Sequence, residues 1–361
     1  TNLGTNIKDT YIGACSNGYH GSGNNYSIQS SAIREIEVIT GTGKKIIINH
    51  TDALFQAFGV NIGALGIIIR VTIACDSLFN LHLKTKRLSL DTFKSHFMSL
   101  LNNNKHMKLI WVPHRDIYQV WTANDTTKPV FSRWKKIKTM VWDGLLMNNL
   151  FHGLLLYMAH FEDTLIPSIN HIMAKKVIPE TGELIFSSED IYYLPHLLKQ
   201  DTVEFAFSMD YIFDFLDDLK TLIDKTPFYV QTPIEVRFVK KDSFWLSPAY
   251  EKDVCYVGTK VHLLPGLSKP DYQPYFKAFN DLVEKYEGKP HWGKQLYMSK
   301  GYLEKTFAHW TSFWTVAQCL DPDHLFTNRF LDHIRPDPNA LDPKTCSIHV
   351  YDELKGHGLL S

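Results

Sequence analysis

The sequence predicts an α+β fold built on a large, mostly antiparallel sheet flanked by helices. Two observations lead to this prediction. From residue 203 the chain reads as a strand, a helix and further strands, and residues 109–112 and 118–121 flank a short polar turn as the arms of a hairpin do. The length of 361 residues is enough for two domains, each with its own core.

The first part of the chain is rich in small residues and short strands. Residues 12–23 contain four glycines, which let a backbone approach a flat ligand, a phosphate or another backbone closely. Strands are expected at 33–40 and 45–49, joined by a Gly-Thr-Gly turn, and Asp52 is expected to cap a short helix. Residues 63–73 pass from small residues into a β-branched run, which predicts a buried strand.

Residues 133–178 are predicted to be helical and are unusually apolar. Polar side chains interrupt the apolar runs, so no stretch of about 18 apolar residues exists and a membrane-spanning helix is not expected. The basic run 133–138 suits a helix pair that lies on a membrane surface. The alternative is an ordinary interface between domains or subunits.

The rest of the chain carries periodic patterns as far as residue 335. Strands are expected at 203–209, 233–239 and 254–264, and amphipathic helices at 211–224 and 272–286. The last 26 residues, from Pro336, are rich in Pro and Asp and are predicted to form a peripheral tail.

Composition and missing motifs exclude several classes of function. The 38 basic and 38 acidic residues cancel, so the chain lacks the positive charge that nucleic-acid binding requires. The sequence contains no Gly-X-Ser-X-Gly elbow, no phosphate-binding loop and no His-Glu-X-X-His motif. Its five cysteines are scattered and its 17 histidines are not at metal-ligand spacing, so neither a disulfide framework nor a bound metal is expected.

The segment Ile234–Phe238 combines an apolar pattern with two charges. On a strand, Glu235 and Arg237 point to one face while Ile234, Val236 and Phe238 point to the other. A Glu and an Arg on a covered face are costly unless they pair with each other or meet a polar ligand. The segment is therefore either part of a site or an exposed salt bridge worth less than about 1 kcal/mol.

The segment Gly288–Lys294 places several functional side chains in one turn. Pro290 ends the preceding helix, and His291, Trp292 and Lys294 follow within four residues. A lysine held near a delocalised anion stabilises it electrostatically. The alternative is a surface loop with a buried tryptophan.

These two segments belong to a longer series of motifs. In chain order the series is Ser16–Gly23, Asn61–Ile68, Leu109–His114, Pro233–Phe238, Leu246–Pro248, Lys289–Lys294 and Leu320–Asn328. On these motifs the chain resembles, from residue 1 to about residue 334, the sugar-lactone and alditol oxidases of the vanillyl-alcohol-oxidase flavoprotein group.

The resemblance implies a fold and a cofactor. Residues 1–77 would be the second half of a PCMH-type FAD-binding domain, and residues 78–335 a cap domain with the large sheet and a C-terminal segment that contacts the flavin. Residues 336–361 would be the tail. FAD would lie between the two domains, and the half of the flavin domain that holds the pyrophosphate loop would precede Thr1 in a longer chain.

The resemblance also implies the site residues. Arg237, oriented by Glu235, would lie beside flavin N5 and the substrate hydroxyl. Lys294 would lie at the N1/C2 edge and offset the negative charge of the reduced ring, and His291 would complete the catalytic set. The residues expected to contact the cofactor are Gly13, Ser16, Gly18, His20, Gly21, Gly23, Gly63, Gly66, Ile67 and Trp292.

The implied activity is oxidation of a secondary alcohol of a sugar-1,4-lactone of the gulono, galactono or arabinono type, as in ascorbate-like biosynthesis. Hydride would pass to flavin N5, and oxygen or another electron acceptor would reoxidise the flavin. Two alternatives stay open: a flavoenzyme for a different polyol or sugar, and a non-catalytic structural or binding protein that no longer binds FAD. Peripheral membrane contact through 133–178 would place the protein at the endoplasmic reticulum or another membrane compartment.

Overall fold

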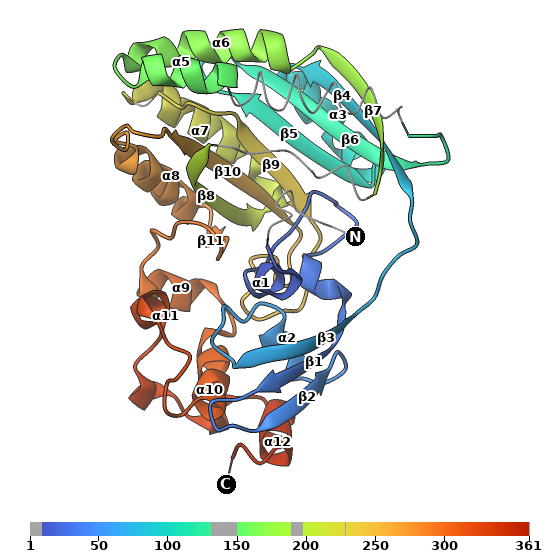
Figure 1. Cartoon of the computed structure of the whole chain (residues 1–361), viewed down its shortest axis with the longest axis vertical. Helices are drawn as coiled ribbons and strands as arrows, with labels where there is room; N and C mark the ends of the chain where they lie inside the picture. Colours follow the sequence, from blue (N-terminus) through green and yellow to red (C-terminus); the bar gives the residue numbers. More distant parts are fainter. Residues whose placement is uncertain (1–8, 131–149, 189–197, 228, 361) are drawn as a thin grey trace.

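Two antiparallel sheets, one of three strands and one of eight, organise the molecule (Figure 1). The computed structural model describes residues 9–130, 150–188, 198–227 and 229–360. The small sheet lies in the lower half of the view in Figure 1 and the large sheet in the upper half, and residues 74–79 connect them. The α+β prediction with a large antiparallel sheet is confirmed.

The small sheet has the order β2-β1-β3. Its strands are β1 (Ile33–Ile39), β2 (Lys45–Asn49) and β3 (Ile67–Ile73). The first two strands form where the sequence predicts them, because apolar side chains that point inward, such as Ile36, Val38, Ile46 and Ile48, are fully or almost fully buried. Helix α1 (Tyr11–Ser16) and the short helix α2 (Phe55–Phe58) pack beside this sheet.

Strand β3 forms, but the prediction that it is buried is wrong. Ile67, Ile69 and Ile73 are 38–55% exposed, and no residue of the strand is fully buried. The strand lies at the edge of its sheet and pairs only with β1 among the described residues. A run of β-branched residues predicts a strand, but it does not show whether another element covers that strand.

The C-terminal segment from Pro336, which the sequence predicts to be a peripheral tail, packs against the rest of the protein. It ends in helix α12 (Ile348–Gly356), whose Val350 and Leu354 are buried. The Glu353 carboxylate accepts hydrogen bonds at 2.8 Å from the backbone N–H groups of Ala53 and Leu54, just before α2. The predicted cap, Asp52, instead accepts from the Asn49 N–H at 2.7 Å, so a residue 300 positions away caps this helix.

The large sheet has the order β11-β8-β10-β9-β5-β6-β4-β7, and every described pair of neighbours is antiparallel. Its strands are β4 (Asn80–Leu88), β5 (His106–Val112), β6 (Ile117–Thr126), β7 (Thr181–Ser187), β8 (Lys199–Ser208), β9 (Ile234–Val239), β10 (Val254–Leu263) and β11 (Lys289–Pro290). The predicted hairpin is therefore β5 and β6.

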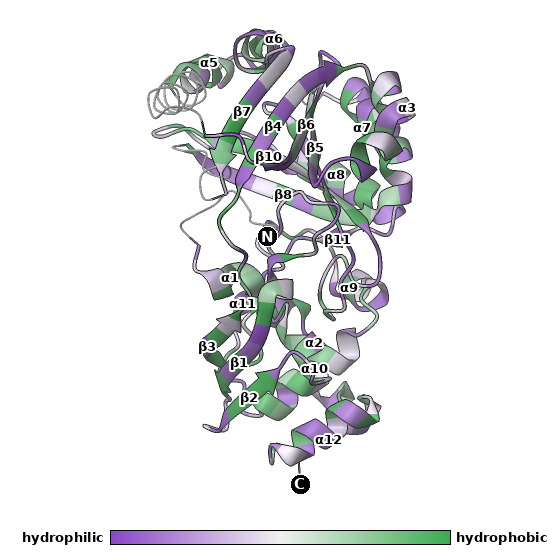
Figure 2. Ribbon diagram, turned by 90° about the vertical axis from the view of Figure 1, so that its right-hand side faces the viewer, coloured by the Kyte–Doolittle hydropathy of each residue, from purple (hydrophilic) through white to green (hydrophobic). Residues whose placement is uncertain are grey.

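The two faces of the large sheet differ in character. Helices α3 (Leu90–Asn102), α7 (Ile212–Lys225) and α8 (Gln273–Lys285) lie along one face (Figure 2). That face is apolar, because the inward side chains of α7 and α8 pack with those of the strands into one core. The alternating residues of β5, β8, β9 and β10 place charged side chains on the opposite face.

Helices α5 (His152–Ala159) and α6 (Ile166–Val177) lie over the end of the large sheet (Figure 1). Ala174 of α6 and the following Ile178 pack with Val112 of β5. The first part of the predicted apolar helical segment, residues 133–149, lies outside the described residues. The remaining elements are α9 (Lys300–Thr306), α10 (Trp310–Leu320), α11 (Arg329–Ile334) and the 3-10 turns Gln29–Ala32, Asp163–Leu165, Met209–Tyr211, Pro338–Ala340 and Pro343–Thr345.

Candidate active site

The Glu235–Arg237 pair of β9 lies on the charged face of the large sheet. Arg237 Nη2 donates to Glu235 Oε2 at 2.8 Å. Their side chains are only 25% and 17% exposed, while Ile234, Val236 and Phe238 are fully buried on the other face. The pair is therefore not the exposed salt bridge that the sequence left as an alternative.

Two lysines from neighbouring strands lie close to Glu235. Lys260 of β10 places Nζ 3.8 Å from Glu235 Oε1. Lys108 of β5 pairs in register with Arg237, and its Nζ lies 4.1 Å above the ring of Trp121. Burial raises the pKa of Glu235, but Arg237, Lys108 and Lys260 together hold it well below its ordinary value.

A second carboxylate, Glu204 of β8, lies on the same face and is 7% exposed. Its Oε1 is 3.9 Å from Arg237 Nη1 and 3.7 Å from His20 Nε2. One ring nitrogen of His291 lies within 4.8 Å of these ligand atoms. Burial opposes the charge of Glu204, but Arg237 and the other neighbouring groups lower its pKa to about 2.

His20 and His291 are buried and neutral at physiological pH. His20 stacks on Tyr256 with ring centroids 3.6 Å apart, and its centroid is 5.4 Å from that of His291. Burial lowers the pKa of His20 to about 4 and that of His291 to about 3. The two rings therefore act as hydrogen-bonding groups rather than as cations.

Lys294 belongs to the same cluster. Its backbone N–H donates to the His291 carbonyl at 3.0 Å, which closes the turn after β11. The charge of its side chain acts on Glu204, His20 and His291, and the same three residues feel the charge of Arg237. Arg237 and Lys294 thus share their neighbours.

The predicted cofactor residues divide into two groups. His20 and the glycines beside it reach the cluster: Gly21 accepts a bond from the His20 ring at 2.9 Å, and Gly23 bridges to Val239 at the end of β9. Gly18 and Gly63 adopt positive φ angles of 69° and 78°, which favour glycine, and Gly63 has open space where a side chain would be.

The other predicted residues have structural contacts. Gly13 and Ser16 lie in α1, and the Ser16 carbonyl accepts a bond from the Ile62 N–H at 3.0 Å. A Cβ on Gly66 would lie 2.6 Å from Val38, so this glycine permits close packing against β1, and Ile67 is 55% exposed.

Trp292 is part of the core and of a backbone contact. Its indole N–H donates to the Leu246 carbonyl at 2.7 Å, and its ring stacks on Trp310.

The sequence did not identify Lys108, Glu204, Tyr256 or Lys260, because each lies outside the recognised motifs and only the strand register brings it to the site.

The cluster fits a flat, polar group that accepts negative charge. The basic side chains of the cluster outnumber its carboxylates. The basic residues are Lys108, Arg237, Lys260 and Lys294, and the carboxylates are those of Glu204 and Glu235. Within the described residues, the Tyr256 hydroxyl and His20 Nε2 have no hydrogen-bond partner. The flavin of FAD is flat, carries donors and acceptors along its edge and becomes anionic on reduction, so the residues fit this cofactor.

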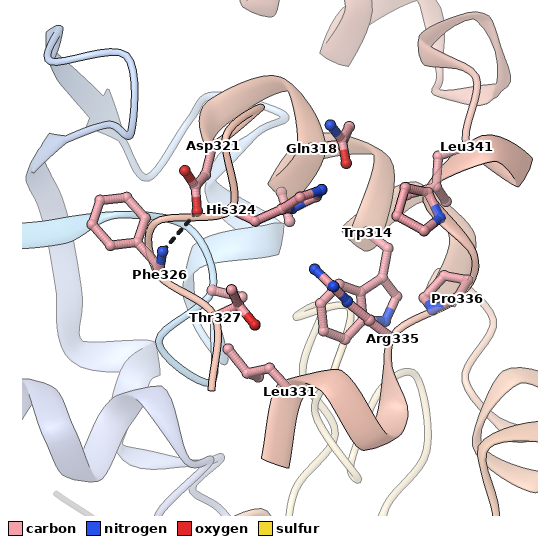
Figure 3. Close-up of a pocket in the computed structure, with 13 residues that line it drawn as sticks. Trp314, Gln318, Asp321, His324, Phe326, Thr327, Leu331, Arg335, Pro336 and Leu341 are labelled. Atoms are coloured by element: carbon pink, nitrogen blue, oxygen red, sulfur yellow. Dashed lines mark hydrogen bonds between the residues drawn. The ribbon is translucent and has the colours of Figure 1, made fainter. Parts of the chain in front are cut away.

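The Leu320–Asn328 motif shapes a separate hollow (Figure 3). The hollow has a volume of about 40 Å³ and is lined by residues that include Trp314, His324 and Arg335. The Asp321 carboxylate accepts from the N–H groups of Leu325 and Phe326 at 2.9 and 2.8 Å, so its role here is to form a turn. The hollow is far too small for a flavin and shares no residue with the cluster around Arg237.

Among the residues that the structure describes, the fold brings together one group with metal-ligand chemistry that sequence spacing did not reveal. It consists of His20, Glu204 and His291. His291 Nδ1 accepts the Gly293 N–H at 3.0 Å, so in the neutral ring Nε2 carries the proton and has no lone pair for a metal. The charges of Arg237 and Lys294 also disfavour a cation at this position.

Comparison with known proteins identifies the family. The sequence profile of D-arabinono-1,4-lactone oxidase matches residues 71–334. The chain belongs to this family. It is 26% identical to L-gulonolactone oxidase of Scyliorhinus torazame over 336 residues, which cover 92% of this chain and 75% of that protein. It is also 26% identical to L-gulono-1,4-lactone dehydrogenase of Mycobacterium tuberculosis, with 91% and 74% covered.

Solved structures show the same fold. Cholesterol oxidase from Brevibacterium sterolicum superimposes with a TM-score of 0.72 at 14% sequence identity, covering 93% of this chain and 76% of that one. The family resemblance stated from the sequence is confirmed. Oxidases and dehydrogenases of this family are FAD-linked oxidoreductases, so the predicted enzyme class and cofactor are confirmed at that level.

Proposed function

We propose that this chain oxidises a secondary alcohol of a sugar-1,4-lactone of the gulono, galactono or arabinono type, and that it does so with FAD. One observation carries the proposal. The Arg237 guanidinium is held on a largely buried sheet face by two carboxylates, Glu235 at 2.8 Å and Glu204 at 3.9 Å, beside the neutral rings of His20 and His291. The identity to lactone oxidases and dehydrogenases supports the substrate class.

Arg237 is the residue that binds and activates the alcohol. Oxidation releases the hydroxyl proton to water, and a fixed guanidinium stabilises the negative charge that develops on the oxygen as the proton leaves. Burial opposes the charge of Arg237, but Glu235 and Glu204 raise its pKa, so the guanidinium stays protonated throughout catalysis. Glu235 fixes its orientation through the 2.8 Å hydrogen bond.

The remaining residues hold the cofactor and the rest of the substrate. Bound FAD supplies the acceptor for the hydride that leaves the carbon. Lys294, His20 and Tyr256 would hold it, since the lysine supplies positive charge and the two aromatic side chains supply unpaired polar atoms. Lys260 and Lys108 lie farther along the sheet from the Gly23–Val239 bridge and offer hydrogen-bond donors to ring and side-chain hydroxyls of a lactone.

Turnover of a lactone panel by the FAD-loaded protein tests the proposal. L-gulono-, L-galactono- and D-arabinono-1,4-lactone are supplied in turn, with oxygen and then an artificial dye as electron acceptor. We expect flavin absorbance in the purified protein and turnover of at least one lactone. A folded protein that never acquires flavin supports the non-catalytic alternative, and turnover of open polyols alone supports a different substrate.

We also propose that α5 contacts a membrane surface from outside the bilayer. Its outward side chains are apolar and exposed: Leu154 at 61%, Met158 at 54% and the following Phe161 at 70%. Lys175 and Lys176 at the end of α6 are exposed and would face anionic headgroups. Among the described residues no helix is long and apolar enough to cross a membrane.

Sedimentation with anionic lipid vesicles tests this contact. The protein is expected to bind the vesicles, and the double change Leu154→Glu and Phe161→Glu should abolish binding without affecting lactone turnover. Equal vesicle binding by the variant would contradict the proposal. A membrane contact of this kind would agree with a location at the endoplasmic reticulum or another membrane compartment.

A further inference from the structure

We propose that Glu204 is a positioning residue that holds the Arg237 guanidinium at Nη1 while Glu235 holds it at Nη2, on a strand that also anchors the His291 turn. The inference rests on the proposed function, because it concerns the same site. Glu204 lies outside every motif recognised in the sequence. Its carboxylate is nevertheless the one group within ion-pair distance of both Arg237 and His20 in the described part of the chain.

Strand register explains how Glu204 reaches Arg237. The two residues lie on β8 and β9, which are separated by β10. The β10 residue opposite Glu204 is Gly258, which also pairs with Glu235. Because Gly258 has no side chain, the Glu204 side chain can lie across β10 towards β9. A Cβ on Gly258 would lie only 3.3 to 3.4 Å from three carbon atoms of Glu204.

Hydrogen bonding defines what the two histidine rings present to Glu204. His20 Nδ1 lies 2.9 Å from the Gly21 carbonyl, which can only accept, so Nδ1 carries a proton. Neutral His20 therefore points the lone pair of Nε2 at Glu204, 3.7 Å away. His291 has the opposite tautomer, because its Nδ1 accepts from Gly293 and its proton is on Nε2.

Glu204 consequently contacts all three segments that build the site. The His291 backbone N–H donates to the Glu204 carbonyl at 2.9 Å, which anchors the turn that carries Lys294. The carboxylate pairs with Arg237 of β9 and lies 3.7 Å from His20 of the Gly-rich segment, to which it makes no hydrogen bond. Removing its charge would leave Arg237 with Glu235 alone and would allow the guanidinium to rotate away from the position between the two carboxylates.

Glu204→Gln tests the inference, with Asp201→Asn as the matched control. Asp201 is on the same strand, but its carboxylate belongs to a different group of contacts: it pairs with Lys269 at 3.2 Å and accepts from the Tyr272 hydroxyl. We expect Glu204→Gln to lower kcat/KM for the lactone by about 10- to 100-fold, mainly through kcat, because a misplaced catalytic group costs about this much. Asp201→Asn should leave both constants within about twofold of the unchanged protein.

A second readout does not depend on flavin or turnover. A dicarbonyl reagent modifies accessible guanidinium groups, and peptide mass spectrometry measures the rate at Arg237. This rate should rise several-fold in Glu204→Gln and stay unchanged in Asp201→Asn. In Gly258→Ala the new methyl group would displace the Glu204 side chain without removing its charge, so the modification rate at Arg237 should rise by a smaller factor. This variant replaces Glu204→Gln in the test if Glu204→Gln does not fold.

The outcomes separate the two proposals. If the unchanged protein oxidises no lactone, the proposed function fails, and the Arg237 modification rate still decides the role of Glu204. If neither Glu204→Gln nor Gly258→Ala alters that rate or kcat, Glu204 does not position Arg237. A gain of activity on adding Zn²⁺ or Mn²⁺ would also overturn the inference, because the three side chains would then be metal ligands.

Discussion

Two ion-paired carboxylates, one in each sheet, show what distinguishes a structural ion pair from a site. Glu37 of β1 is 5% exposed and contacts Lys45 of β2 at 2.8 Å and Arg70 of β3 at 2.9 Å. Glu235 of β9 contacts Arg237 at 2.8 Å and Lys260 at 3.8 Å. Both carboxylates thus lie on an inner strand between two cations.

The difference lies in the cations. The Lys45 and Arg70 side chains are 54% and 70% exposed, so water solvates their charge and the pair needs no further partner. The Arg237 and Lys260 side chains are only 17% and 22% exposed, and Glu204, Lys108 and Lys294 add more charge nearby. Largely covered cations that outnumber their carboxylates indicate a place for a polar ligand, whereas a buried carboxylate alone does not.

The largest expected effect is that of Arg237→Ala. Lactone oxidation should fall by about 1000-fold in kcat/KM, since the guanidinium stabilises charge that develops only during the reaction. The matched change, Arg70→Ala, removes an exposed partner of Glu37 and should leave kcat/KM unchanged. Steady-state kinetics measure both, and circular dichroism verifies the fold. Equal losses in the two variants would remove the distinction between the two ion pairs.

Glu235→Gln should have the next largest effect. The variant keeps the shape of the side chain but loses the charge that holds Arg237 at 2.8 Å, so we expect kcat/KM to fall by about 10- to 100-fold. The same measurement on Glu37→Gln is the control and should show no change. Full activity in Glu235→Gln would mean that Glu204 alone is enough to orient Arg237.

Glu37→Gln should alter stability only. The hydrogen bond from Lys45, together with the charge of Arg70, lowers the pKa of Glu37, so the ionised form contributes to folding above the ordinary pKa of a glutamate. The variant should therefore unfold at a slightly lower temperature at pH 7 and match the native protein at a pH well below that ordinary value. A loss of activity at pH 7 would contradict the structural role assigned to this pair.

The histidines near the large sheet predict a different pH dependence. Burial lowers the pKa of His20, His106 and His152 to about 4 and that of His291 to about 3, below the ordinary value of about 6.5. The unfolded chain binds more protons than the native one between pH 6.5 and about 4, so stability falls as the pH falls through this range. Glu37 contributes to acid sensitivity only at the lower end of this window.

Replacing one histidine away from the reacting groups measures this effect. Between pH 6.5 and 4.5, the denaturation midpoint of His152→Gln should fall less steeply with falling pH than that of the native protein. The difference in slope should correspond to about one proton fewer taken up on unfolding. An unchanged slope would mean that His152 is protonated in the native state.

The sequence predicted the features that depend on neighbouring residues and missed those that depend on contacts between distant segments. The strands β1, β2, β9 and β10 and the helices α7 and α8 carry their own periodic patterns, so their ends were predicted to within one residue. The strands β5 and β8 begin three and four residues before their predicted starts. The adjacency of Glu235 and Arg237 on one face follows from the two-residue period of a strand.

The rest of the site depends on pairings between distant segments. Glu204 becomes a neighbour of Arg237 only because β10 lies between their strands and carries Gly258 at the crossing point. The cap of α2 by Glu353 likewise joins residues about 300 positions apart. No local pattern encodes such contacts. The family motifs identified the fold and the Arg237 segment, but they did not identify Lys108, Glu204 or Lys260.

Single-turnover reduction of the bound flavin is the most direct test of the central claim that Arg237 activates the substrate alcohol. FAD-loaded native protein, Arg237→Ala and Arg70→Ala are mixed anaerobically with the best lactone, and the loss of flavin absorbance is followed in time. We predict rapid bleaching in the native protein and in Arg70→Ala, and bleaching slower by about 1000-fold in Arg237→Ala. Bleaching of Arg237→Ala at the native rate, with the flavin bound, would contradict the account.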